Sequence, residues 1–414
     1  MGELSKLIEK LCPQGVESVP MGSLMKRIRE KGKEDTTVSQ VYVVSNTKGI
    51  VRAEDFRENT IHSNDTSNYT VIRNGMVAYN PSRLNIGSIG MLKYDEPGLV
   101  SPMYVVFEID QSKVNKEYFE YLMKSTYVSK MIDSYKEEGA RFRFDFSRWN
   151  WINVQIPPLE IQECIVKMLN SHTELIKALY AELELRKLQY SHYLDYFFGK
   201  NLDEMKAISE KKGYRMLPIS KVGNLQRGKR FVKADSENLS TGTPCIHYGE
   251  VYTFYGTSAK KSKSFVPDEL ASKLRFAKKG DVVIVGAGEN NIDIGIGVAW
   301  FGDEDVVIHD ACYTFSHEEN PMYISYYLRS NVYHNQIKKY VSEGKICAIS
   351  ADGIGKAMIP LPDSDVQETI VDILSNFDTL CNDKEKGLPA EIALREQQFT
   401  YYRDKLLLFE KVGD

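Results

Sequence analysis

The stretch V-Q-I-P-P-L-E-I-Q-E-C-I-V-K-M-L (residues 154–169) is matched by I-P-L-P-D-S-D-V-Q-E-T-I-V-D-I-L (residues 359–374). Gln162 of the first stretch corresponds to Gln367 of the second, an offset of 205 positions (367 minus 162). Each stretch passes from a proline-marked exit into apolar residues at helical spacing, which predicts the start of a long helix. The chain therefore repeats one local structure at a constant distance.

The same offset of 205 positions holds without a gap toward the N-terminus. Matched pairs are Asn115 and Asn320, Tyr118 and Tyr323, Tyr121 and Tyr326, Ser125 and Ser330, Ile132 and Ile337, Tyr135 and Tyr340, Glu138 and Glu343, and Gly139 and Gly344. A repeat of this length indicates a duplicated domain rather than a solenoid of short units. Two similar modules present two similar surfaces, which suggests a target in two parts. We predict a first module at residues 1–157, a first spacer helix at 158–205, a second module at 206–362 and a second spacer helix at 363–414.

Composition excludes several classes of protein. The 414 residues carry a net charge of -4 with a pI near 6.1, which argues against coating nucleic acid through bulk charge. Charge is nevertheless segregated, because residues 227–279 hold eleven Lys or Arg against five Asp or Glu. The six cysteines are scattered without disulfide or zinc spacing, and we find no apolar run of membrane-spanning length. We expect a cytoplasmic protein with reduced thiols and no membrane partner.

Each module predicts an α+β fold. Short β-branched and aromatic runs bounded by Gly, Asn, Asp or Pro are typical of strands. They lie at residues 41–45, 76–79 and 104–109 in the first copy and at 282–285 and 306–309 in the second. A helical segment follows in each copy, at residues 118–135 and 323–340, and then the proline-marked exit.

After each exit the sequence predicts a coiled-coil helix. Apolar residues recur at alternating steps of four and three, from Ile165 to Phe197 in the first copy. The corresponding residues at the end of the second copy are offset by 209, so four residues have been inserted, and Gly387-Leu388-Pro389 predicts a break there. The predicted seam comprises Ile165, Leu169, Ile176, Leu183, Arg186, Tyr193, Ile370, Leu374, Phe377, Arg395 and Tyr402. We expect Arg186 and Arg395 to extend toward solvent or to pair with Glu across the seam. Ordinary amphipathic core helices are the alternative.

Motifs for catalysis are missing from the sequence. There is no G-x-x-x-x-G-K-[ST] loop, and the glycines around residues 286–297 do not open a helix. Asn80-Pro81-Ser82-Arg83 lacks the aromatic residue that would stack on a flipped base, and histidines and acids show no metal-ligand spacing. The sequence therefore predicts a binding protein without cofactor or metal of its own.

Cations interleaved with aromatic or amide residues predict contacts with DNA. Lys and Arg neutralise phosphates, while Arg, Asn and Gln read base edges. The second-copy equivalents of Arg141 and Arg143 are Ile346 and Ala348, as expected for surfaces that read different sequences, although any single cluster could be a solvated face. The candidate contacts are Asn80, Arg83, Asn85, Arg141, Arg143, Arg148, Lys229, Arg230, Lys260, Lys261, Asn290, Asn291 and Lys345.

These motifs, in this order, resemble the specificity subunits of type I restriction-modification enzymes. The resemblance rests on the two variable modules, the two proline-marked exits and the helix ends A-E-L-x-L-R-x-x-Q-Y (181–190) and A-E-I-x-L-R-x-x-Q-F (390–399). It implies two target recognition domains joined by two long helices that form an antiparallel coiled coil with pseudo-two-fold symmetry. Each domain would read one half of a bipartite double-stranded DNA target, and the helices would measure the gap.

The resemblance also implies partners that perform the chemistry. Two adenine-N6 methyltransferase subunits would bring S-adenosylmethionine, and restriction subunits would use ATP and Mg²⁺. The predicted seam would then also be the face that binds the methyltransferase subunits. Two other classes of function stay open: a duplicated coiled-coil scaffold or adaptor that does not read DNA, and an enzyme of unrecognised type.

Overall fold

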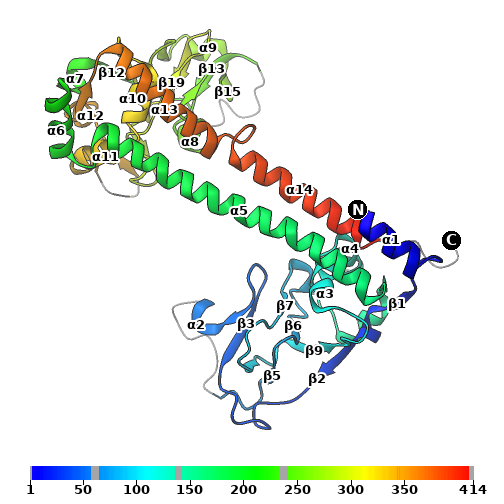
Figure 1. Cartoon of the computed structure of the whole chain (residues 1–414). Coiled ribbons are helices and arrows are strands. Elements are labelled where there is room, and N and C mark those ends of the chain that lie inside the picture. Colours follow the sequence, from blue (N-terminus) through cyan, green and yellow to red (C-terminus); the bar gives the residue numbers. More distant parts are fainter. Residues whose placement is uncertain are drawn as a thin grey trace. The chain divides into compact units, whose positions relative to one another are not determined.

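The computed structural model describes residues 2–56, 65–135, 142–232, 241–342, 344 and 346–409 (Figure 1). The chain divides into two compact units, each with its own core. Unit 1 comprises Met1–Ala178 with Ala393–Asp414, and unit 2 comprises Leu179–Ile392. Helices and strands occur in both units, so the predicted α+β class is confirmed.

Unit 1 contains two four-stranded sheets. One has the order β2-β9-β6-β7 and the other β4-β3-β8-β5, in which β3 and β8 are parallel. Their bounds are β2 (Met25–Ile28), β3 (Val41–Ser45), β4 (Gly49–Arg52), β5 (Thr70–Ile72), β6 (Val77–Tyr79), β7 (Ile89–Met91), β8 (Gly98–Val100) and β9 (Val105–Ile109). The three strands predicted in this module are therefore confirmed as β3, β6 and β9.

Unit 2 repeats this topology with one additional edge strand. Its sheets have the orders β12-β21-β17-β19-β14 and β15-β13-β20-β16, and β13 is again parallel to β20. The bounds are β12 (Gly223–Arg227), β13 (Thr243–Ile246), β14 (Ser258–Ala259), β15 (Ser264–Val266), β16 (Phe276–Ala277), β17 (Val282–Val285), β19 (Gly297–Trp300), β20 (Val306–Ile308) and β21 (Cys312–His317). The central strands β17 and β20 are fully buried, as their continuous apolar runs predict.

Short pairs of strands join the opening of each module to its exit. In unit 1, β1 (Ser18–Pro20) pairs antiparallel with β10 (Asn153–Gln155), and in unit 2, β11 (Arg215–Pro218) pairs with β23 (Met358–Leu361). A further small sheet joins β18 (Ala287–Gly288) to β22 (Cys347–Ala348). Each module is thus closed at its base by the proline-containing segments that the repeat marks.

The predicted helical segments are each divided by a serine. In unit 1 they form α3 (Lys116–Met123) and α4 (Thr126–Ser134), and in unit 2 α10 (Pro321–Tyr327) and α11 (Asn331–Ile337). Ser125 and Ser330 cap the second helix of each pair by accepting a backbone N–H, so the helix must start again there. Shorter helices complete the fold: α1 (Gly2–Leu11), α2 (Ala53–Phe56), α6 (Leu202–Lys212), α7 (Ile219–Val222), α8 (Tyr248–Thr253), α9 (Asp268–Ala271) and α12 (Ala351–Gly355).

A buried glutamine fastens the long helix of unit 1 to its module. Gln162 is fully buried in the first turn of α5 (Leu159–Phe198). Its Oε1 accepts the backbone N–H of Asn115 (2.8 Å), and its Nε2 donates to the carbonyl oxygens of Pro157 (2.7 Å) and Lys113 (2.8 Å). Asn115 in turn caps α3 through its side chain. One amide therefore ties the proline exit, the long helix and the start of α3 together.

Unit 2 reproduces this clamp. Gln367, 2% exposed, lies in the first turn of α13 (Ser364–Asn382). It accepts the N–H of Asn320 (3.1 Å) and donates to the carbonyl oxygen of Pro362 (2.9 Å) and to Glu319 (2.6 Å). The repeated Pro and Gln of the sequence thus mark a repeated buried hydrogen-bond network.

The two long helical arms differ in continuity. The 40-residue helix α5 is unbroken, whereas the second arm consists of α13 and α14 (Leu388–Leu406), with the break where it was predicted. A Cβ added at Gly387 would lie 2.4 Å from the carbonyl oxygen of Thr379. Since such a contact is sterically excluded, the turn between the two helices requires glycine at this position.

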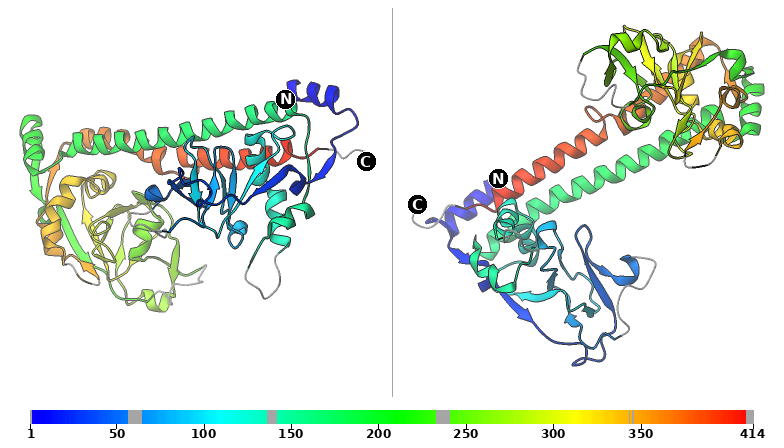
Figure 2. Two further views of the ribbon diagram at one scale, coloured as in Figure 1. Left: turned by 90° about the horizontal axis from the view of Figure 1, so that it is seen from below. Right: turned by 180° about the vertical axis from the view of Figure 1, so that it is seen from behind.

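Within each unit, part of α5 packs against the second arm. In unit 1, His172 stacks on Tyr402 of α14 at 5.9 Å between ring centroids, and Figure 2 shows these helices side by side. In unit 2, Leu183 clusters with Cys381 and Ile392, and Tyr193, further along α5, stacks on Phe377 at 5.0 Å. The pairing in unit 2 is antiparallel, because residue numbers rise along α5 as they fall along its partners.

Of the predicted seam residues, Leu183, Tyr193, Phe377 and Tyr402 lie in these contacts. Ile165 and Leu169 belong to the core of unit 1, and Ile370 and Leu374 to the core of unit 2, as expected for helices that pack on their modules. Ile165, Leu169, Leu183, Ile370 and Leu374 are buried, and Ile176, Arg186, Tyr193, Phe377, Arg395 and Tyr402 are half-buried. Of the two arrangements expected for Arg186, the structure shows extension toward solvent, because its side chain is 40% exposed and its ion pair does not cross the seam. Arg186 pairs with Glu182 of its own helix (2.9 Å) and donates to Gln189 (2.9 Å), because residues one helical turn apart lie within reach of a long side chain.

The predicted domain limits can be compared with the elements. The limit at 157/158 lies just before α5, and that at 362/363 just before α13. The first spacer helix ends at Phe198, so the limit at 205/206 falls inside α6.

Replacing Gln162 by Leu should destabilise the protein by roughly 2–4 kcal/mol, because each buried backbone group that loses its hydrogen bond costs about 1–3 kcal/mol. Denaturant unfolding followed by circular dichroism measures the change. Gln397→Leu is the matched control, because Gln397 is exposed on α14. Equal effects of the two substitutions would contradict the structural role of the buried amide.

Candidate nucleic-acid interface

The first candidate surface in unit 1 is the turn between β6 and β7, residues 80–88. Asn80 is 8% exposed, and its Oδ1 accepts the N–H of Ser82 (3.0 Å), so this side chain shapes the turn. Arg83 and Asn85 lie on the exposed side, before and within the 3-10 helix η2 (Leu84–Ile86). The turn therefore exposes the guanidinium of Arg83 and the amide of Asn85 to solvent, while Asn80 stabilises its backbone.

The comparable turn of unit 2, residues 286–296, links β17 and β19. Asn290 Oδ1 accepts the N–H groups of Ile292 (3.0 Å) and Asp293 (3.1 Å), and its Nδ2 donates to the Asp293 carboxylate (2.8 Å). Asn291 is exposed beside it. Of the two predicted contacts here, Asn290 holds the turn and Asn291 is displayed by it.

Sequence reasoning missed two exposed apolar residues in these turns. Ile86 is 56% exposed and Ile292 is 79% exposed. Each directly follows an exposed asparagine, in Asn85-Ile86 and Asn291-Ile292. The repeated Asn-Ile pair was a signal in the sequence, but only the strand pairing shows that both pairs lie at equivalent turns.

The arginine-aromatic segment of unit 1 is divided between core and surface. Phe144 and Trp149 are fully buried and pack on each other at 4.7 Å between ring centroids. Arg143 is exposed and pairs with Asp145 (3.0 Å), whereas Arg148 donates to the carbonyl oxygen of Tyr135 (2.7 Å). The aromatic residues thus stabilise the module, and among the described residues of this segment Arg143 presents its charge to solvent.

The predicted contacts Arg141 and Lys345 lie outside the described residues, as do Glu138, Gly139 and Glu343.

The basic segment of unit 2 follows edge strand β12. Lys229 Nζ donates to the carbonyl oxygen of Lys273 (2.7 Å), and Arg230 is exposed next to it. Phe231 is 2% exposed and packs on His309 at 5.0 Å. Burial lowers the pKa of His309, whose Nδ1 accepts a backbone N–H, so this histidine is neutral at physiological pH. The positive charge of this surface therefore comes from Lys and Arg and not from His309.

A second basic segment of unit 2 surrounds β14. Lys260 and Lys261 are exposed directly after this strand. Lys263 lies over the ring of Phe254 at 4.9 Å from the centroid, and that ring is itself 56% exposed. This arrangement of cations on an exposed aromatic ring suits contact with phosphates and sugars rather than base reading.

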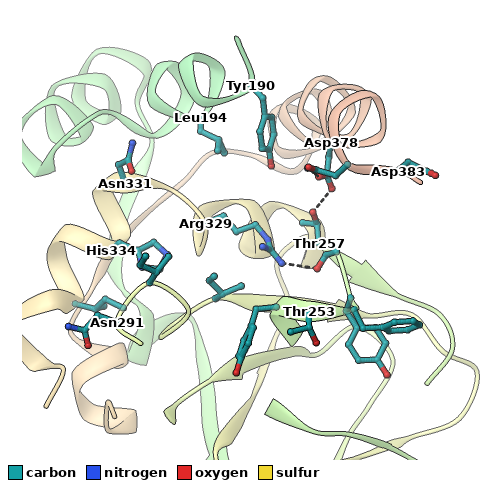
Figure 3. Close-up of a pocket in the computed structure, with 18 of the residues that line it drawn as sticks. Tyr190, Leu194, Thr253, Thr257, Asn291, Arg329, Asn331, His334, Asp378 and Asp383 are labelled. Carbon is teal, nitrogen blue, oxygen red and sulfur yellow. Dashed lines mark hydrogen bonds between the residues drawn. The ribbon is translucent and has the colours of Figure 1, made fainter. Parts of the chain in front are cut away.

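A cavity of about 1040 Å³ lies in unit 2 where α5 and α13 meet the module (Figure 3). Arg329 donates to the carbonyl oxygen of Gly256 (2.7 Å), and Thr257 donates to Asp378 of α13. Burial lowers the pKa of Arg329 and raises that of Tyr190 on α5. The contact between Thr257 and Asp378 fastens α13 to the module, whereas the buried hydroxyl of Tyr190 has no hydrogen-bond partner among the described residues.

The surfaces of the helical arms carry exposed apolar residues. Leu185 is 63% exposed and Leu188 68% exposed on α5, and Leu394 is 49% exposed on α14. Leu185 and Leu394 are equivalent in the repeated helix ends. These leucines lie outside the predicted seam and are accessible to another protein.

The described residues contain no group of three or more His, Cys, Asp or Glu placed to hold a metal ion. None of the helices described has the length and apolar character needed to cross a membrane.

Comparison with known proteins places these features in a family. The family model described as type I restriction modification DNA specificity domain matches residues 17–185 and 211–394. A putative type I restriction enzyme specificity subunit of Haemophilus influenzae is 30% identical over 273 residues, which are 62% of this chain and 64% of that relative. The chain thus spans just under two thirds of that protein. The Escherichia coli EcoR124I/EcoR124II specificity subunit is 27% identical over 332 residues, 77% of each chain.

Solved structures share the fold. A structure described under complex assembly and conformational transition of the type I R-M system has a TM-score of 0.60 at 14% identity, covering 95% of this chain and 98% of that one. The HsdS subunit of Thermoanaerobacter tengcongensis has a TM-score of 0.53 at 15% identity, covering 97% and 98%. At such low identity the likeness establishes the fold, with two tandem modules and long helices.

Leu183→Ala should destabilise the helical pairing by about 2–4 kcal/mol, because the deleted atoms leave a cavity among Leu183, Cys381 and Ile392. Leu185→Ala, two residues further along α5 and 63% exposed, should change stability by less than about 0.5 kcal/mol. Thermal unfolding of the two variants makes the comparison. A larger loss for Leu185→Ala would contradict the observed packing.

Proposed function

The chain belongs to the type I restriction-modification DNA specificity family, and we propose that each unit reads one half of a split double-stranded DNA target. The main support is that unit 2 repeats the strand order of unit 1 with one additional edge strand, β14, while equivalent turns of the two units carry different side chains. Arg83 and Asn85 occupy the turn of unit 1, whereas Asn291 occupies that of unit 2. A common scaffold with different polar groups is what recognition of two different half-sites requires.

The basic segments support this proposal with a phosphate-binding role. Lys229, Arg230, Lys260 and Lys261 are exposed in unit 2, and Arg143 is exposed in unit 1. Such cations give affinity and orientation without reading sequence, and their contribution weakens as salt concentration rises. A scaffold that does not bind DNA would lack this salt dependence.

Chemistry in this proposal belongs to partner subunits. Two adenine-N6 methyltransferase subunits bring S-adenosylmethionine, restriction subunits use ATP and Mg²⁺, and this chain supplies specificity in the cytoplasm without a cofactor of its own. The exposed leucines of α5 and α14 support a role in assembly, because apolar groups left in water are stabilised when another protein covers them.

The helical arms have a proposed measuring role. At about 1.5 Å per residue, a continuous helix of 40 residues is roughly 60 Å long. One turn of DNA is about 34–36 Å, so a rigid helical spacer can convert its own length into a fixed number of base pairs.

The decisive experiment is a long-read methylome of a methylation-free host that expresses this chain with its cognate methyltransferase subunit. We expect N6-methyladenine at one split motif that disappears when this chain is omitted. Arg83→Ala should relax one half of the motif and Asn291→Ala the other, since a bidentate base contact contributes about 1–3 kcal/mol of discrimination. Copurification of the two proteins without any methylated motif would favour the adaptor function instead.

A second experiment tests the assembly surface. The double variant Leu185→Asn and Leu394→Asn should fold normally, because both side chains are exposed, but should copurify with the methyltransferase subunit at least tenfold more weakly, which corresponds to about 1.4 kcal/mol. Ser191→Asn, also exposed on α5, is the control. Undiminished binding by the double variant would remove these leucines from the interface.

A further inference from the structure

We propose that Ile86 and Ile292 contact thymine methyl groups in the major groove, each beside the asparagine that precedes it. This inference rests on the proposed DNA-reading function and assigns a specificity role to two residues that charge and hydrogen-bonding arguments overlook. Its basis is that both units display an exposed Asn-Ile pair at the turn between equivalent strands.

Each turn contains one buried aliphatic side chain and one exposed isoleucine. In unit 1, Leu84 is 3% exposed while Ile86, two residues later, is 56% exposed. In unit 2, Ile294 is fully buried while Ile292, two residues earlier, is 79% exposed. Each turn already has an aliphatic residue in its core, so the second one is not needed for packing within the turn.

The backbone of both turns is held in place. In unit 1, Gly87 adopts a φ of +84° and donates to the carbonyl oxygen of Leu84 (2.9 Å), which closes η2 directly after Ile86. In unit 2, the side chain of Asn290 accepts the N–H of Ile292 itself. A rigid turn keeps the displayed isoleucine in one position and lowers the entropy lost on binding.

The turn of unit 2 is further constrained next to its tip, the exposed pair Asn291-Ile292. Gly295 has a φ of +90°, and a Cβ there would lie 2.5 Å from Cδ1 of Ile337 on α11. The turn is therefore seated on the helical layer of its module. Ile292 is displayed from a fixed base and not from a loose loop.

The chemistry of the pair matches the major groove of an A·T-containing site. Asparagine can donate from Nδ2 to adenine N7 and accept the N6–H of the same base at Oδ1, and thymine presents its 5-methyl group on the same groove edge. The minor groove presents no apolar group on the base edges. An exposed isoleucine could make apolar contact there only by inserting between bases and unstacking them.

Charges around the tip of unit 2 favour a base edge over the phosphate backbone. Within the turn, Glu289 directly precedes Asn290, and Asp293 directly follows Ile292, with its carboxylate held by Asn290. Carboxylates repel phosphates, so this turn is less suited to backbone contact than the segments after β12 and β14, where Lys229, Arg230, Lys260 and Lys261 are exposed.

The test uses the complex of this chain with its methyltransferase subunit and duplexes that carry the split motif found in the methylome. Each thymine of the motif is replaced in turn by uracil, which removes only the methyl group. We expect one thymine in each half whose replacement weakens binding about fourfold, the effect of one buried methyl-sized group. Ile86→Ala should abolish this penalty in one half, and Ile292→Ala should abolish it in the other.

Controls distinguish the possible outcomes. Met103→Ala, which removes an apolar side chain 57% exposed elsewhere in unit 1, should leave both uracil penalties intact. Failure to find any split motif would overturn the proposed function. The inference alone would be overturned if the motif is read normally but neither isoleucine substitution changes the loss of binding caused by uracil. It would also be overturned if 2-aminopurine fluorescence showed that the isoleucines unstack bases instead.

Discussion

Two buried glutamine amides organise this protein. Gln162 and Gln367 each hold a proline exit, the first turn of a long helix and the N-terminus of a capped helix in one hydrogen-bond network. A buried amide is stabilising only when its donors and acceptors are satisfied, so the network permits one local geometry for the helix relative to the exit and the capped helix. The turns and loops of the modules can therefore vary while the attachment of each helix stays the same.

Much of the fold could be predicted because the chain contains two copies of one module, and residues shared by both copies indicate structural roles. Residues needed by both copies, such as Asn115 and Asn320 or Ser125 and Ser330, proved to be helix caps. The strands were recognised by their β-branched runs, and the helical break by Gly387 and Pro389. Local chemistry determines these features, so a single sequence was sufficient to find them.

The candidate site was predictable only in outline. Arg83, Asn85, Asn291 and the lysines after β12 and β14 are exposed, but Asn80 and Asn290 are occupied in holding turns, and Phe144 and Trp149 belong to the core. Sequence patterns give the type of a side chain but not its direction, which depends on strand pairing between distant residues. For the same reason the isoleucines of the two tips and the exposed leucines of the arms could not be recognised.

The turn between α13 and α14 has a consequence for how this family member can change over evolutionary time. Each residue deleted from a helix rotates everything beyond it by about 100°, so the loss of one or two residues would move Ile392 away from Leu183. Loss of four residues, about one helical turn, would return the side chains beyond it to nearly the same direction around the helix axis. The first arm, α5, lacks these four residues and is unbroken. Heritable length changes in this arm should therefore occur in steps of about one helical turn, with Gly387 retained wherever the break is retained.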